Sequence, residues 1–188
     1  WNAKVRSDLC QNVSTHAIPG TIFVSPSPLK SPWHAAEALF HEAGHKKLSD
    51  LVFSRSIFVS GYSEQKSPTI RALWNRSLSW NSADWSVDRA LFAFHVYVHL
   101  GLFFAVVAER AVELEARFGP LCGMNPRQSF RSACNKARYL GRQINRFAPE
   151  ALGSDGRDFV SWMMGVLDRL DPTPPINDPS VHLLLERY

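Results

Sequence analysis

The feature that most constrains this chain is the segment from Trp33 to Leu51, which has the composition of one long helix. It contains a single glycine and no proline, and its apolar residues recur at helical spacing. Ser31-Pro32 precedes it, and proline is favoured in the first turn of a helix. Within the segment, residues 41–45 form an HExxH motif. The sequence therefore predicts a helix that carries a pair of histidines on one face.

The HExxH motif predicts a metal site. On a helix, the imidazoles of His41 and His45 project from the same face and can bind one metal ion. Glu42 follows the first histidine, where its carboxylate can hydrogen-bond a metal-bound water or a substrate. We therefore assign His41 and His45 as metal ligands and Glu42 as the catalytic carboxylate.

A catalytic metal site needs a third protein ligand, and two histidines downstream are the candidates. His95 and His99 are also four residues apart, within a strongly apolar stretch that we expect to be helical. Burial of two histidines in such a helix is costly unless both are satisfied, and a position opposite the HExxH motif meets that need. One of the two is expected to bind the metal, and the other to orient the site from behind the ligands. Both zinc and iron accept imidazole ligands, so the histidines alone do not select the metal.

The rest of the chain reads as mainly α. Further helices are expected over residues 86–118, 127–147 and 155–170, with a strand at 21–25 and a loop-rich crossing at 56–82. We predict a mainly α, helical metalloenzyme domain with at most one or two short strands, formed as a single domain by residues 1–188. The chain begins at Trp1 without an initiator Met, which leaves open a longer protein of which it is the C-terminal part.

Charge and cysteine content narrow the partners. The formal net charge is only +4, and the basic residues are scattered among acids, so we expect no nucleic-acid partner. Cys10, Cys122 and Cys134 are an odd number of cysteines without CxxC spacing, which predicts a reduced, cytoplasmic protein. Residues 90–108 are apolar enough to span a bilayer. They contain two histidines and have charged flanks, so we expect a central buried helix and no membrane partner.

Several blocks along the chain carry a family resemblance: Pro19–Ser25, Leu39–Leu48, Trp80, Tyr97–Gly101, Ala137–Arg142 and Ala151–Val160. In this order they resemble the HExxH-motif peptide-modification proteins of bacterial natural-product clusters, which are grouped as 2-oxoglutarate-dependent HExxH hydroxylases. Tyr97–Gly101 is similar to the family's Tyr-x-His-Leu-Gly block, which singles out His99 as third ligand. The last block is the loosest, because Gly153 stands where the family pattern has Thr.

The resemblance implies an oxygenase that binds Fe(II) and 2-oxoglutarate and uses O2. Its substrate is a peptide or amino acid, alone or bound to a carrier or leader, hydroxylated at an unactivated carbon such as Cβ. The far carboxylate of 2-oxoglutarate needs a cation, and Arg138 occupies the matching family position, with Arg131 and Arg142 on neighbouring turns as alternatives. Glu42 then hydrogen-bonds within the site.

The alternative is a zinc-dependent peptidase or other hydrolase. In that case Glu42 deprotonates a zinc-bound water that attacks an amide. Two features weigh against it. Lys46-Lys47-Leu48-Ser49 follows the motif, so the extended HExxHxxGxxH pattern is absent. The expected scarcity of strands also disagrees with the sheet of the usual zinc peptidases.

Overall fold

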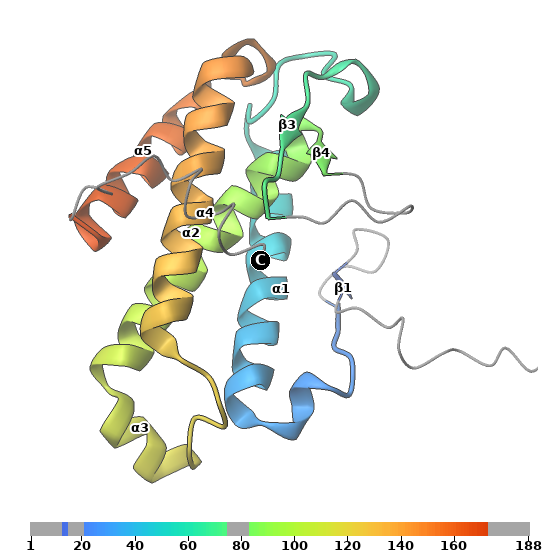
Figure 1. Cartoon of the computed structure of the whole chain (residues 1–188). Helices are drawn as coiled ribbons and strands as arrows, with labels where there is room; N and C mark the ends of the chain where they lie inside the picture. Colours follow the sequence, from blue (N-terminus) through green and yellow to red (C-terminus); the bar gives the residue numbers. More distant parts are fainter. Residues whose placement is uncertain (1–12, 15–20, 75–82, 173–188) are drawn as a thin grey trace, which may run out of the picture.

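The computed structural model describes residues 13–14, 21–74 and 83–172 (Figure 1). In this part of the chain there are five α-helices: α1 (Pro32–Ser54), α2 (Val87–Glu109), α3 (Ala111–Phe118), α4 (Pro126–Phe147) and α5 (Ser154–Leu170). The strands are β1 (Val13–Ser14), β2 (Ile22–Phe23), β3 (Ile70–Arg71) and β4 (Asp84–Trp85). The predicted mainly α fold class is confirmed.

The strands are short and pair two by two. β1 pairs with β2, and β3 pairs with β4, both antiparallel. The strand expected at residues 21–25 corresponds to β2, while the other strands were not anticipated. Strand content is as small as predicted, but it is divided among four two-residue pieces. Trp80, one of the residues that carry the family resemblance, lies outside the described residues.

The long helices run in alternating directions, and α2 lies at the centre. α2 packs against α1, α4 and α5, and its contact with α4 is the most extensive in the fold (Figure 1). In length and composition α2 could also cross a membrane, and 56% of its most apolar window is buried inside the bundle. Residues 90–108 therefore lie at the centre of the bundle, as expected. The absence of a membrane partner stays a prediction.

The helix predicted over residues 86–118 is divided in two at Arg110. The backbone of Arg110 has φ −105° and ψ 19°, outside the α-helical region. Buried residues continue along α2 as far as Val107, whereas α3 has none. The apolar pattern that holds α2 in the core therefore ends where the chain changes direction.

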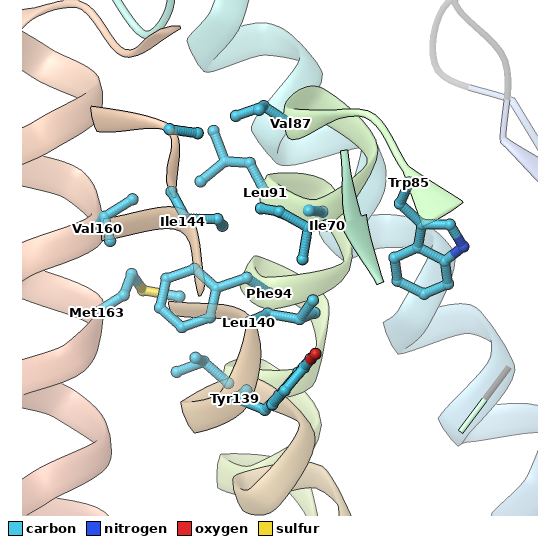
Figure 2. Packing of buried hydrophobic residues seen from close by; sticks show 14 of the residues in the cluster. Ile70, Trp85, Val87, Leu91, Phe94, Tyr139, Leu140, Ile144, Val160 and Met163 are labelled. Carbon is cyan, nitrogen blue, oxygen red and sulfur yellow. The ribbon is translucent and has the colours of Figure 1, made fainter. Parts of the chain in front are cut away.

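The core lies between α2, α4 and α5. Figure 2 shows Phe94 of α2 directed between Met163 of α5 and Leu140 of α4, and all three side chains are fully buried. Gly141 makes this approach possible, because a Cβ there would lie 2.5 Å from the sulfur of Met164 and about 3 Å from the Phe94 ring. This close packing holds α2 rigidly, so the side chains on its other faces have fixed positions.

A second close approach joins the end of α1 to the start of α5. A Cβ on Gly153 would lie 2.1 Å from the Ser56 carbonyl oxygen, and one on Gly156 would lie 2.0 Å from that of Ile57. Because real Cβ atoms do not come this close to backbone, both positions require glycine.

Candidate metal centre

The two histidines of the HExxH motif converge at one point. His41 and His45 are successive-turn neighbours on α1, and their Nε2 atoms are 3.2 Å apart. Two imidazole nitrogens about 2.0–2.1 Å from one zinc ion, at a tetrahedral angle, lie about 3.3–3.4 Å from each other. The observed separation therefore matches two nitrogens arranged to share one ion.

Burial keeps both imidazoles neutral. It lowers the pKa of His41, against a smaller opposing effect of the Glu42 charge. The pKa of His45 is lowered to about 4, chiefly by burial and further by the nearby His41. The ring of Phe92 from α2 stacks on His45 at a centroid distance of 6.1 Å, which contributes to that burial. Only neutral imidazole binds metal, so the pair is in its binding form at neutral pH.

Glu42 lies beside the pair in a hollow of about 600 Å³. Its side chain is only 4% exposed, yet it forms part of the wall together with His41. Ser25, Ser27 and Pro28, from the segment before α1, also line the hollow. A buried carboxylate next to a metal-binding histidine can accept a proton or a hydrogen bond from a molecule in the hollow.

His95 and His99 form a second pair on α2, with different surroundings. His95 is 2% exposed and packs its ring against Phe159 of α5. The pKa of His95 is lowered to about 3, chiefly by burial and further by His99, His45 and Lys47, while a backbone hydrogen bond with Gly44 opposes this shift. The Nδ1 atom of His95 is buried without a partner in the part of the chain that the structure describes.

His99 is less buried and is oriented by the backbone. Its Nδ1 atom is 2.9 Å from the carbonyl oxygen of His95, and its ring contacts Phe40 at a centroid distance of 6.3 Å. A carbonyl that binds Nδ1 directs Nε2 outward, which is how many metal-binding histidines are held. Each member of this pair thus has one nitrogen suited to a ligand role.

The two pairs do not gather into one ligand set. Among the described residues, no three His, Cys, Asp or Glu side chains lie close enough together to hold a metal ion. His45 is near enough to His95 for its charge to lower the pKa of His95. The assignment of His99 as third ligand, with His95 behind it, stays a prediction.

Arg138 has a structural partner. Its guanidinium is buried and donates from Nη1 to the carboxylate of Asp171 at 2.6 Å. Nη2 donates to the backbone carbonyl oxygens of Leu167, at 3.2 Å, and of Asp171. Arg138 therefore ties α4 to the end of α5, and its role toward 2-oxoglutarate stays a prediction.

Three polar residues near the site were not singled out by sequence. His34 and Glu37 line the same hollow as His41, and Lys136 of α4 lines an adjoining one with Glu37. The spacing of residues 34, 37 and 41 places them on one face of a helix, which is a signal available in the sequence. No such local signal connects Lys136 to α1, because that proximity depends on how α4 packs.

Comparisons with known proteins add no relatives. No known protein family matches this chain, and no curated protein matches it either.

Proposed function

We propose that the chain is an Fe(II)- and 2-oxoglutarate-dependent oxygenase that hydroxylates an unactivated carbon of a peptide or amino acid. The observation that carries this proposal is the convergence of His41 and His45, with Nε2 atoms 3.2 Å apart, beside the buried Glu42. The sequence resemblance to HExxH hydroxylases selects oxidation rather than another metal-dependent reaction.

The His41–His45 pair offers two nitrogen donors of the kind that divalent metals bind. His41 and His45 supply two neutral nitrogens, and His99 or His95 is the candidate for a third. Such an all-imidazole set accepts iron as well as zinc. Iron held by these histidines would supply the activation of O2, coupled to conversion of 2-oxoglutarate into succinate and CO2.

The residues of the chain then have distinct tasks. Glu42 accepts a hydrogen bond from the substrate or from a bound water within the hollow. Phe92 covers one face of His45 and restricts water at the imidazole. Asp171 holds the Arg138 guanidinium at the end of α5, so binding of 2-oxoglutarate there requires exchange of one carboxylate for another.

A zinc-dependent hydrolase is the second candidate, and the position of Glu42 favours it. A buried carboxylate next to a metal-binding histidine is what a hydrolase needs to deprotonate water. Against this, every strand in the described part of the chain is two residues long, so no extended sheet lies along α1 to hold a peptide.

The test is succinate formation from 2-oxoglutarate by anaerobically purified protein, first supplied with Fe(II) and then exposed to air. We expect iron-dependent succinate in the wild type and none in His41→Ala. Asp50→Asn is the matched control, because Asp50 is an exposed residue of the same helix that does not line the hollow, and it is expected to keep turnover. Tightly bound zinc together with peptide cleavage and no succinate would overturn the oxygenase in favour of the hydrolase.

A further inference from the structure

A second polar hollow adjoins the one at His41. It has a volume of about 440 Å³ and lies between α1, α2 and α4. Glu37 of α1 lines both hollows, so the two meet at this side chain. A volume of this size is at the small end of the range for ligand pockets, which is about 300–1,000 Å³.

The walls of this hollow carry opposite charges. Glu37 comes from α1, and Lys136 comes from α4. Burial raises the pKa of Glu37, while the charges of His34 and Lys136 oppose that shift. The charged form of a partly buried carboxylate is stabilised by each cation near it. An ammonium group of a ligand beside Glu37 is therefore favoured.

The position of the Lys136 ammonium is defined by aromatic rings. Its Nζ atom lies 5.5 Å from the ring centroid of Tyr97 and 5.9 Å from that of Trp74, within the range of cation–π attraction. Ser129 and Ser132 precede it on the same face of α4 and line the same hollow. Two hydroxyls and an ammonium together are suited to bind a carboxylate.

We propose that this hollow binds the head group of a free α-amino acid, with its ammonium at Glu37 and its carboxylate at Lys136, Ser129 and Ser132. A purely anionic ligand would meet the Glu37 carboxylate, and the interior of a peptide lacks both charges. The zwitterion alone matches both walls.

The proposal gives the proposed oxygenase its substrate class. It rests on the proposed function in one respect, namely that the side chain of the bound amino acid extends toward the metal centre. Glu37 and His41 are one helical turn apart, and side chains at that spacing lie about 5–6 Å from each other. A head group held at Glu37 therefore brings carbons a few bonds away to His41. The binding site itself is independent of any metal.

The experiment is equilibrium binding to the full chain, freed of metal with EDTA. Saturation-transfer NMR with a pool of the common free amino acids identifies a binder, and calorimetry then measures its affinity. The same amino acid is compared with its N-acetyl form and with its methyl ester. We expect either blocked form to bind at least about tenfold more weakly than the free amino acid.

Two variants test which residue binds the ammonium and which binds the carboxylate of the amino acid. Glu37→Gln should remove the preference for the free amine over the N-acetyl form, and Lys136→Met should remove the preference for the free acid over the ester. Asp50→Asn on α1 and Arg146→Met on α4 are matched controls, since both residues are exposed, and each should keep both preferences. Circular dichroism and thermal unfolding establish that the variants are folded, and Glu37→Asp and Lys136→Arg provide charge-retaining substitutes.

Absence of binding by any free amino acid overturns the proposal. Equal binding of free and blocked forms also overturns it and indicates a peptide ligand. Preferences that persist in both variants show that the head group binds elsewhere. Because no iron is present, a failed succinate assay leaves this result unchanged, and binding lost in the variants leaves the metal site intact.

Discussion

The two histidine pairs have the same spacing and opposite environments. His41 and His45 are both partly exposed, their Nε2 atoms lie 3.2 Å apart, and His41 lines a hollow. His95 is enclosed between α1 and α5, and His99 is hydrogen-bonded to the backbone of its own helix. Spacing of four residues places two imidazoles on one face, but only the surroundings decide whether both are directed at one point.

The difference has a physical origin in the helix that carries each pair. α1 lies on the side of the bundle, and α2 passes through its centre. His41 on α1 can therefore face an accessible hollow, while His95 on α2 meets other helices. The first pair is suited to bind metal directly, and the second to support the site or to complete it from one side.

The largest expected effect concerns the first pair. His41→Ala or His45→Ala should lower affinity for Zn²⁺ or Fe(II) by more than about a hundredfold, because changes behind metal ligands alone reach about that size. Calorimetric titration of the metal into the metal-free protein measures this. His34→Ala should change affinity no more than about twofold, and a loss equal to that of His41→Ala would show that the ion lies elsewhere.

The second pair should give unequal losses. We expect His99→Ala to lower metal affinity by about a hundredfold and His95→Ala by about tenfold, as for a ligand and a residue that orients one. The same titration, with circular dichroism to establish folding, compares them. Equal losses, or the reverse order, would contradict the assignment of His99 as third ligand.

The free energy of unfolding should depend more on the second pair than on the first, which is the reverse of the order expected for metal affinity. In metal-free protein, His95→Ala should lower the free energy of unfolding by about 2 kcal/mol, since it leaves a cavity between packed helices. His41→Ala should change it by less than about 0.5 kcal/mol, because that ring lines a hollow. Urea denaturation measures both, and similar values would mean that His41 also belongs to the core.

The last expected effect, of similar size, is on the pH dependence of stability. The pKa of His95 is about 3 in the folded protein, below its ordinary value of 6.5, so the unfolded chain binds more protons between these limits. Stability is then complete above pH 6.5 and is lost as the pH falls, by about 2 kcal/mol at pH 5 from this residue. Denaturation of metal-free wild type and His95→Gln at pH 7 and pH 5 measures this contribution. An unchanged difference between the two pH values would show that His95 is not the group that titrates.

Local patterns predicted most of the helices. Residues 127–147 and 155–170 were expected to be helical, and the structure has α4 and α5 there with boundaries that differ by one residue. The pattern failed where no core packing supports it, at the break between α2 and α3. Helix periodicity depends on neighbouring residues, whereas the direction of a helix end depends on what it packs against.

The candidate site was only partly accessible to the same reasoning. HExxH spacing located His41, His45 and Glu42 on one helix, because positions along a helix are set by its backbone alone. The role of Arg138 could not be read in this way, since its partner Asp171 is 33 residues away in the chain. Likewise, Glu37 and Lys136 meet through the packing of α1, α2 and α4.

The sequence by itself determined the mainly α class, the helix that carries the histidine pair and the placement of that pair on one face of the helix. These properties follow from short-range geometry, which composition and spacing encode directly. Only the tertiary structure decided which histidines face a hollow, which arginine is held by an acid and which charges share a wall. Such contacts join residues far apart in the chain, and they exist only once the helices have packed.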